Sequence, residues 1–487
     1  MDKMNRAVRR MWMSAACVFI LLMGTLSYIQ VFDADNLMAN QWNNRALYDN
    51  YGANRGPIVV DGVEIASSVP SNDEFNYQRV YSGSNAATAR KYAGVTGYYS
   101  LNGATGIEQA MDSELAGTSD KQFYDRLVQM FSGHAARGAS VELTLDSKLQ
   151  ELSADLLAGH KGAIVAMNPK TGEILAMATS TSYDPNALAS HNNTSVLNEY
   201  AALEADPQQP LVNRAIGGNT YAPGSTFKII DTVAALESGK YNGQSTLDNP
   251  QNLLLPGTNT YLPNYVGGQC STRTKATIEW ALAQSCNTPF AQIAMDLGED
   301  KIAQTAANFG YGQQLSVPLT VTPSVFPTGM DKSQLALASI GQYDVKTTPL
   351  QVAMMSSAIA NKGVQMKPNL VRSVKTSNLS TIYEFSPEKL RTSTNPQVAE
   401  QVKNLMVNSV DNGIASRVKV SGVKVAGKTG TAEIGTTGLN NSWFTGFAPA
   451  DDPQIAIAVV YEGENVSAGA QLSTNAGKQL FEAVLNK

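Results

Sequence analysis

The sequence is poor in the residues that build metal sites and disulfide scaffolds. Its 487 residues include only three histidines and three cysteines. His134, His160 and His191 lie far apart, and neither a His-x-x-x-His nor a Cys-x-x-Cys spacing occurs. Metal sites are built from such closely spaced side chains, and a disulfide scaffold needs more cysteines. We therefore expect no metal ion and no other cofactor.

Charge is also scarce. The charged fraction is 16%, and 36 lysines and arginines stand against 41 aspartates and glutamates, a formal net charge of −5. Without a basic excess, the sequence predicts no nucleic-acid partner. The low charge, together with 43% hydrophobic residues, argues against long disordered or coiled-coil stretches. At about 100–200 residues per domain, the length predicts about two to four domains.

A long apolar run near the N-terminus predicts a membrane anchor. Residues 11–32 carry no charge, and at about 1.5 Å per residue they form a helix of about 33 Å, enough to cross a hydrocarbon core of about 30 Å. Positive residues stay in the cytoplasm. We therefore predict a cytoplasmic tail over residues 1–10, a single-pass anchor over residues 11–32 and an extracytoplasmic remainder. Four basic residues precede the run: Lys3, Arg6, Arg9 and Arg10.

A cleaved signal peptide is the alternative to an anchor. The run is long for a signal peptide, and the flank after it contains no small-x-small cleavage site. Cys17 lies inside the run and lacks the preceding leucine of a lipoprotein signal. We favour the uncleaved anchor.

In the remainder, Cys270 and Cys286 either form a disulfide or stay as buried free thiols, and we favour the disulfide.

The chain after the anchor divides into two predicted domains. Residues 33–139 predict an irregular, mixed module, which contains a short strand closed by an Asp61-Gly62 turn and no catalytic cluster. Residues 140–487 have strands at both ends and helical patterns between them, from about residue 226 to 405. This order predicts an α+β fold in which an antiparallel sheet packs against a helical cluster. The strand predictions are residues 140–145, a hairpin over 162–178, and runs at 423–426, 442–447 and 455–461.

A serine and a lysine lie one helical turn apart at the start of a helical pattern. Pro223 and Gly224 precede Ser225, and the pattern stops at Gly239. Lys228 is three residues after Ser225 and therefore on the same helix face. A serine hydroxyl becomes a nucleophile when a base removes its proton, and a neutral amine in a crowded cationic pocket can do this. On its own, Ser-x-x-Lys is common by chance, and a solvent-facing helix cap explains the pair better.

Two further short motifs follow in the sequence. Ser285-Cys286-Asn287 comes directly after a helical run, where a hydroxyl and an amide could project into a cleft. Residues 428–431, Lys-Thr-Gly-Thr, continue an apolar run and so lie on a strand or its edge. Glycine there allows a substrate backbone to approach closely. Neither motif is specific by itself.

Residues 422–429 also satisfy the G-x-x-x-x-G-K-[ST] pattern of a phosphate-binding loop. The interior of this segment is Val-Lys-Val-Ala, which favours a strand, whereas a phosphate-binding loop must curl and then open a helix. The residues after Thr429 do not begin a helix, and an extracytoplasmic domain meets little ATP. We therefore reject a nucleotide site.

Ser-x-x-Lys, Ser-x-Asn and Lys-Thr-Gly occur in this order in serine β-lactamases and penicillin-binding proteins. At these motifs the chain resembles the class B penicillin-binding proteins, and its modest length resembles the penicillin-binding protein A type. Arg55-Gly56-Pro57-Ile58 is similar to the family's pedestal motif, and residues 427–433 and 443–447 are similar to the strands that flank its cleft. The resemblance covers nearly the whole chain and is loosest over residues 70–137. It implies a dimerisation-like pedestal at 33–139 and a β-lactamase/transpeptidase-like domain at 140–487.

The resemblance implies a peptidoglycan D,D-transpeptidase. Ser225 would attack the carbonyl between the last two D-alanines of a stem peptide, with Lys228 as its base. Ser285 would relay the proton to the leaving group, and Lys428 would hold Lys228 partly neutral. β-Lactams would acylate the same serine. The implied substrate-binding residues are Asn287, Thr429, Gly430 and Thr431, and the backbone N–H groups of Ser225 and Thr431 would form the oxyanion hole.

Three alternatives share these motifs. A β-lactamase or D,D-carboxypeptidase would use water in place of the amine acceptor, but the sequence shows no deacylating base. A β-lactam-sensing receptor would need a cytoplasmic signalling part, and only about ten residues precede the anchor. An idle scaffold would not need all three motifs intact. The family resemblance also implies contact with a membrane glycosyltransferase of the shape, elongation and division type.

Overall fold

The computed structural model describes residues 2–33, 37, 51–124, 137–218, 220–265 and 267–485. His134 lies outside these residues, as do parts of the predicted pedestal, residues 34–36, 38–50 and 125–136.

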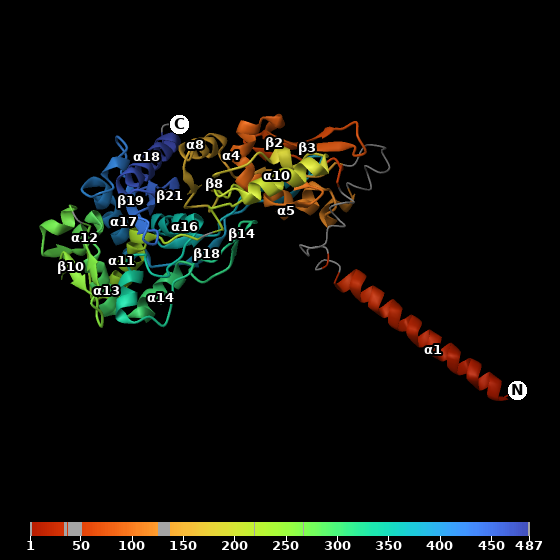
Figure 1. Ribbon diagram of the computed structural model, residues 1–487, viewed down its shortest axis with the longest axis horizontal. Coiled ribbons are helices and arrows are strands. Elements are labelled where there is room, and N and C mark those ends of the chain that lie inside the picture. Colours follow the sequence, from red (N-terminus) through yellow and green to blue (C-terminus); the bar gives the residue numbers. More distant parts are fainter. Residues whose placement is uncertain are drawn as a thin grey trace.

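A five-stranded antiparallel sheet forms the centre of the larger lobe (Figure 1). The hairpin β7–β8 pairs with the last three strands of the chain through β21, so strands almost 300 residues apart lie side by side. This confirms the predicted antiparallel sheet. In spatial order the strands are β19 (Ala426–Glu433), β20 (Asn440–Ala448), β21 (Ile455–Glu464), β7 (Lys161–Met167) and β8 (Ile174–Ser180).

Helices cover both faces of this sheet. Odd-numbered residues of β21, such as Ile457, pack in a cluster with α18 (Val466–Leu485). Even-numbered residues, such as Ala458, pack in the main core with α16 (Pro349–Ala360). Because both faces are buried, the strand is an uninterrupted apolar run without the alternation of a half-exposed strand.

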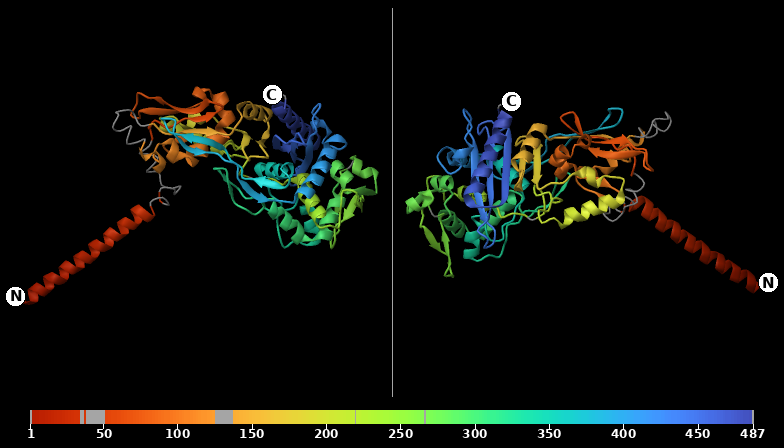
Figure 2. Two further views of the ribbon diagram at one scale, coloured as in Figure 1. Left: turned by 180° about the vertical axis from the view of Figure 1, so that it is seen from behind. Right: turned by 45° about the horizontal axis from the view of Figure 1, so that its top comes forward.

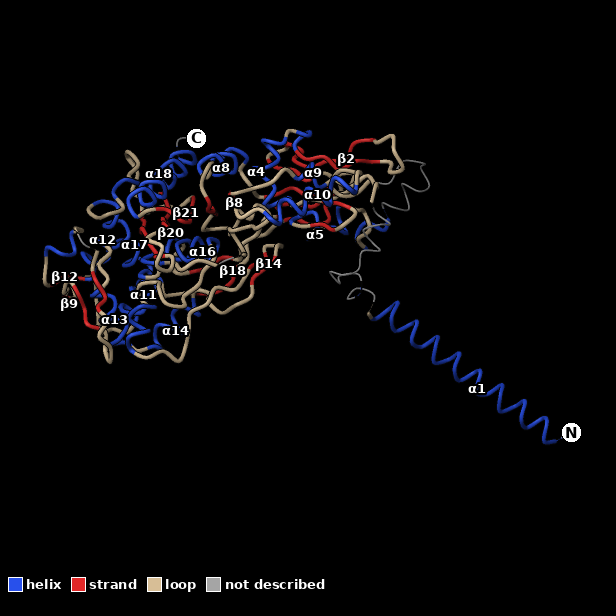
Figure 3. The backbone as a smooth tube through the Cα atoms, viewed as in Figure 1, coloured by secondary structure: helices blue, strands red, loops and turns tan. Residues whose placement is uncertain are grey.

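The helical cluster surrounds α11 (Lys228–Glu237), which is buried almost along its whole length. It packs against α13, α14 and α17, and α12 packs against α17. Two small antiparallel ladders, β9–β12 and β10–β11, belong to this region, and in the first of them β12 contacts α12 and β9 contacts α13 (Figure 3). The bounds are α12 (Ile278–Gln284), α13 (Thr288–Leu297), α14 (Glu299–Asn308), α15 (Lys332–Ala338), α17 (Pro396–Asp411), β9 (Thr246–Asp248), β10 (Asn252–Leu254), β11 (Tyr261–Pro263) and β12 (Lys275–Thr277).

A second sheet, of six strands, forms the smaller lobe. Asp61 and Gly62 both have positive φ and close the hairpin of β1 and β2, as the Asp-Gly signal predicts. The sheet extends past the predicted boundary at residue 139, because β6 pairs with β1 and β16 pairs with β6. In spatial order it contains β17 (Thr381–Glu384), β16 (Val371–Lys375), β6 (Ser140–Leu143), β1 (Ile58–Val60), β2 (Val63–Pro70) and β3 (Tyr77–Tyr81).

A buried ionic cluster holds this lobe together. Glu108 accepts hydrogen bonds from Arg55 and Arg79, and Arg55 also pairs with Asp112. The segment has more regular structure than its weak periodicity predicts, because tertiary contacts override weak local preferences. The remaining elements are α4 (Ala86–Thr96), α5 (Gly106–Ala110), α6 (Asp112–Leu115), α8 (Ser147–Leu156), α9 (Pro185–Leu188), α10 (Asn193–Ala205), β4 (Tyr99–Ser100), β5 (Gly103–Ala104), β13 (Leu315–Ser316), β14 (Thr320–Val321), β15 (Val364–Met366) and β18 (Lys389–Thr392).

The N-terminal helix α1 (Asp2–Ser27) lies apart from both lobes in all three views (Figures 1 and 2). The apolar stretch Val8–Val31, which continues from α1 into the π-helical turn at Tyr28–Phe32, is long enough to cross a membrane, and none of it is buried by the rest of the protein. This agrees closely with the anchor predicted at residues 11–32. The helix fits a single-pass membrane anchor.

Candidate active site

Ser225 lies in a tight turn directly before a buried helix. It is the middle residue of the 3₁₀ turn η4 (Gly224–Thr226), and α11 begins at Lys228. Gly224 has φ +52°, and a Cβ atom there would lie 2.4 Å from the carbonyl oxygen of Thr431. Glycine is therefore required where the turn meets β19. Ser225 itself is half-buried between buried neighbours.

Lys228 joins the first motif to the second. Its Nζ donates hydrogen bonds to the backbone oxygen of Ser285 and to Oδ1 of Asn287, both at 2.8 Å. The side chain is fully buried. Burial is the largest effect that holds the pKa of Lys228 well below its usual value, and the charge of Lys428 lowers it further. The sequence predicted only the second of these causes.

Lys428 joins the third motif to the second. Its Nζ donates to Oγ of Ser285 at 2.7 Å and to the backbone oxygen of Thr429 at 2.8 Å. This side chain is also fully buried, and burial lowers the pKa of Lys428 to about 7. Ser285 thus accepts hydrogen bonds from two lysines, one at its carbonyl and one at its hydroxyl.

The Ser-x-Asn motif occupies a strained corner between two helices. Ser285 ends α12 in the left-handed conformation, with φ +60°, and Asn287 immediately precedes α13. A non-glycine residue in this region costs on the order of 1 kcal/mol, and such residues concentrate at functional sites. The corner directs the hydroxyl of Ser285 and the amide of Asn287 toward the two amines.

Gly430 has a packing reason in addition to the predicted one. A Cβ atom on Gly430 would lie 2.8 Å from Cγ2 of Thr226 and 2.9 Å from the carbonyl oxygen of Pro223. The glycine is therefore needed for the Ser225 turn to pack on β19, whatever the substrate requires. Trp443, paired with Gly430 across the sheet, adds a second link, because its Nε1–H donates to the carbonyl oxygen of Ala222 at 3.0 Å.

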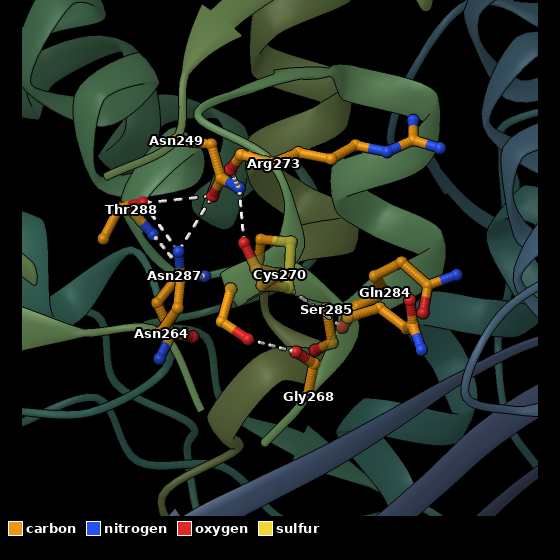
Figure 4. Close-up of a disulfide and its surroundings, with 12 residues drawn as sticks. Asn249, Asn264, Gly268, Cys270, Arg273, Gln284, Ser285, Asn287 and Thr288 are labelled. Carbon is orange, nitrogen blue, oxygen red and sulfur yellow. Dashed lines mark hydrogen bonds between the residues drawn. A yellow bond between two sulfur atoms is a disulfide. The ribbon is translucent and has the colours of Figure 1, made fainter. Parts of the chain in front are cut away.

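Cys270 and Cys286 form a disulfide (Figure 4). The middle residue of the Ser-x-Asn motif is thereby joined to the 3₁₀ turn at Gln269–Thr272. Among the described residues, Cys17 is the free cysteine. The described part of the chain contains no group of three or more His, Cys, Asp or Glu side chains arranged to hold a metal ion.

A buried asparagine pair, missed in the sequence, supports the same motif (Figure 4). Oδ1 of Asn264 accepts the backbone N–H of Asn287 at 2.7 Å and that of Thr288 at 3.2 Å. Nδ2 of Asn264 donates to Oδ1 of Asn249, whose own Nδ2 donates to the carbonyl oxygen of Cys270. No spacing signal connects these residues, since Asn249 and Asn264 lie in short loops beside β10 and β11.

The structure thus collects the predicted site residues at one place. Lys228, Ser285, Asn287 and Lys428 are connected by hydrogen bonds, and the turn of Ser225 packs against the strand of residues 428–431. The individual roles of these residues remain predictions.

Comparison with known proteins decides the family. Residues 162–485 match the model of the penicillin-binding protein transpeptidase domain. Residues 55–141 match that of the penicillin-binding protein A dimerisation domain. The chain belongs to the penicillin-binding protein family. The predicted family, fold class and enzyme class are confirmed.

Relatives of this penicillin-binding protein match along its full length. The peptidoglycan D,D-transpeptidase PbpA of Mycolicibacterium smegmatis is 38% identical over 99% of this chain and 100% of the relative. PbpA of Mycobacterium tuberculosis H37Rv is 37% identical, over 99% of each chain. Penicillin-binding protein A from M. tuberculosis, solved as a ceftriaxone acyl-enzyme complex, has a TM-score of 0.85 and 38% identity, covering 90% of this chain and 99% of that one. Its penicillin G acyl-enzyme complex has a TM-score of 0.84 and the same identity, covering 89% and 100%.

Proposed function

We propose that this penicillin-binding protein cross-links peptidoglycan stem peptides through an acyl-enzyme on Ser225. The observation that carries the proposal is the hydrogen-bonded path from Lys228 through Ser285 to Lys428, next to the turn that presents Ser225. It supplies a base, a hydroxyl relay and a second amine around one hydroxyl. The full-length relatives named D,D-transpeptidase support the same activity.

The first half of the reaction forms the acyl-enzyme. Neutral Lys228 takes the proton from Oγ of Ser225 as that oxygen attacks the carbonyl between the last two D-alanines. The carbonyl oxygen becomes an oxyanion held by the backbone N–H groups of Ser225 and Thr431, each worth about 3 kcal/mol in the transition state. The peptide C–N bond then breaks, and D-alanine leaves with a proton relayed through the hydroxyl of Ser285.

The second half transfers the acyl group. An amine from a neighbouring stem attacks the ester carbonyl, loses its proton to the site, and releases Oγ of Ser225 as a hydroxyl again. Asn287 would bind the amide of the donor stem. Thr431, with Lys428, would bind the terminal carboxylate, and Thr429 and Gly430 form the strand along which the stem lies. A β-lactam would acylate Ser225 by the same first step.

The lifetime of the penicillin adduct separates this function from hydrolysis. A cross-linking enzyme excludes water from the ester, so we expect the adduct of the purified full-length chain to persist for hours, as measured by intact mass spectrometry. Release within seconds to minutes would identify a β-lactamase or D,D-carboxypeptidase and refute the transpeptidase assignment.

The disulfide gives a second prediction. The corner of Ser285 and Asn287 is held both by the Cys270–Cys286 bond and by Asn264. Losing one of these two supports should misplace the Ser285 hydroxyl without unfolding the corner. We therefore expect the double variant Cys270→Ser, Cys286→Ser to be acylated about tenfold more slowly. The measurement is the second-order rate constant of acylation by fluorescent penicillin.

Treatment with a reductant provides the matched control. It should slow acylation of the wild-type protein and leave the double variant unchanged, since that variant has no bond left to break. An unchanged rate in the double variant would show that the bond has no part in acylation.

We also propose that the N-terminus is cytoplasmic and that the catalytic domain is extracytoplasmic. The basic residues before the apolar helix support this orientation.

We further propose that the pedestal contacts a membrane glycosyltransferase of the shape, elongation and division type. Co-purification of such a glycosyltransferase tests the contact. If the glycosyltransferase still co-purifies after deletion of residues 33–139, a contact through the pedestal is excluded.

A further inference from the structure

The helix that carries Lys228 also carries a carboxyl group to which the reaction gives no role. Asp231 lies on α11, three residues after Lys228, and is fully buried. Neither of its carboxyl oxygens has a hydrogen-bond partner in the part of the chain that the structure describes. Buried polar groups are normally paired, because an unpaired one loses its bonds to water without replacement. An unpaired buried carboxyl on the same helix as the proposed base, three residues away from it, therefore needs an explanation.

The charge of Lys228 lowers the pKa of Asp231. The charge of Lys428 lowers the pKa of Lys228, and the charge of Asp231 raises it. All three side chains are fully buried. The other charged side chains on α11 and on the helices packed against it are paired or exposed. Ion pairs account for most of them: Asp296 of α13 with Lys240, Lys301 of α14 with Glu237 of α11, and Lys403 of α17 with Glu400 and Asp451. Glu299 accepts hydrogen bonds from the backbone N–H groups of Gly329 and Met330. Asp300 and Asp411 are exposed.

We propose that Asp231 is a positioning residue that acts through Lys228 and sets the charge with which this lysine meets Ser225. The inference rests on the proposed function in one respect, the role of Lys228 as the base.

The three buried groups have to satisfy two opposing requirements. Lys228 must be neutral to accept the proton of Ser225, and it must also be basic enough to take that proton. Burial and Lys428 both lower the pKa of Lys228 and secure the first requirement, whereas the charge of Asp231 opposes them and secures the second.

The carboxyl can do this without trapping Lys228 as a cation. Burial raises the pKa of Asp231 well above its usual value, against the pull of Lys228. The neutral acid with the neutral amine has the same total charge as the ionised pair, so the titrations of the two groups are coupled, and Asp231 is ionised chiefly when Lys228 is protonated. An exposed carboxylate at this position would instead stay ionised and hold Lys228 protonated.

The variant Asp231→Asn tests the proposal, because it keeps the shape of the side chain and removes its charge. Acylation requires neutral Lys228, so the rate rises as the pH rises through the pKa of Lys228. Without Asp231 that pKa falls further. We expect the acid limb of the pH profile to move about half a unit or more to lower pH, and the plateau rate to fall about threefold or more because the base is weaker. The measurement is the second-order rate of penicillin acylation of the full-length chain across pH.

Ser409→Ala is the matched control. Ser409 lies on α17, which packs against α11, and its hydroxyl is also buried and unpartnered, but it carries no charge. We expect this variant to keep both the acid limb and the plateau. If Asp231→Asn does not fold, Asp231→Ala provides the same test, with a thermal melt to verify folding.

An acid limb that stays in place or moves to higher pH in the folded Asp231 variant would overturn the proposal. The variant Lys228→Met separates this failure from a failure of the proposed function. If Lys228→Met retains wild-type acylation and its acid limb, Lys228 is not the base, and the assignment fails at that residue rather than at Asp231.

Discussion

We expect the replacement of Ser225 with alanine to abolish covalent labelling by fluorescent penicillin while the protein stays folded. Oγ of Ser225 is the atom that would form the ester, and alanine leaves nothing at that place to attack the β-lactam carbonyl. The side chain is half-buried in the middle of a glycine-dependent turn and adds little to the core. We expect acylation to fall by at least about 10³-fold and the melting temperature to change little, as measured by gel fluorescence and calorimetry.

Ser238→Ala is the matched control for this variant. Ser238 follows the other end of α11, where its hydroxyl donates to the carbonyl oxygen of Ala235. This change removes a hydroxyl from the opposite end of α11 without touching the proposed nucleophile, so labelling should remain at the wild-type level. Labelling that persists in Ser225→Ala would assign the nucleophile to a different residue.

The second large effect is expected from Lys228→Met. Methionine keeps nearly the length of the side chain, but it removes the amine that would take the proton of Ser225 and the two hydrogen bonds to Ser285 and Asn287. General-base catalysis contributes about 10²–10⁴-fold, and we expect the acylation rate to fall by about that factor. Stopped-flow measurement at saturating and subsaturating penicillin separates the loss in the chemical step from any loss in binding.

Two controls sharpen this result. Lys424→Met removes an exposed lysine just before β19, where it pairs with Asp451, and should acylate at the wild-type rate. Lys228→Arg keeps a hydrogen-bonding cation that does not deprotonate in proteins. If Lys228→Arg remains active while Lys228→Met is inactive, Lys228 contributes hydrogen bonds and not a base.

Local patterns in the sequence were enough for the elements that depend on near neighbours. The Ser225–Lys228 spacing predicts two side chains one turn apart at the start of a helix, and the structure places Ser225 in the 3₁₀ turn directly before α11 and Lys228 at the first position of α11. The apolar runs at 442–447 and 455–461 predict strands because both faces of those strands are buried. The apolar N-terminal run predicts a long helix from its length and composition alone, because such a helix satisfies its own backbone hydrogen bonds and needs no partner segment.

Other features of the site depend on contacts between residues far apart in the sequence, which motif spacing does not predict. Asn264 supports Asn287 from 23 residues away, and Asp231 becomes noteworthy only when its burial is known. Gly430 shows the same limit. A side chain at this position would collide with Pro223 and Thr226, which lie in a turn about 200 residues earlier in the sequence. The predicted reason, close approach of a substrate, was the one available from a strand considered alone.

The sequence by itself determined the three motifs, the order of strands and helices, and an apolar N-terminal helix, because each depends on side chains within a few residues of one another. Only the tertiary structure decided that two lysines 200 residues apart meet at Ser285. Lys228 donates a hydrogen bond to the backbone carbonyl of Ser285, and Lys428 donates one to its hydroxyl. The physical reason is that the antiparallel sheet brings β19 against the turn of Ser225, and the burial that follows removes water from both amines and lowers the pKa of each.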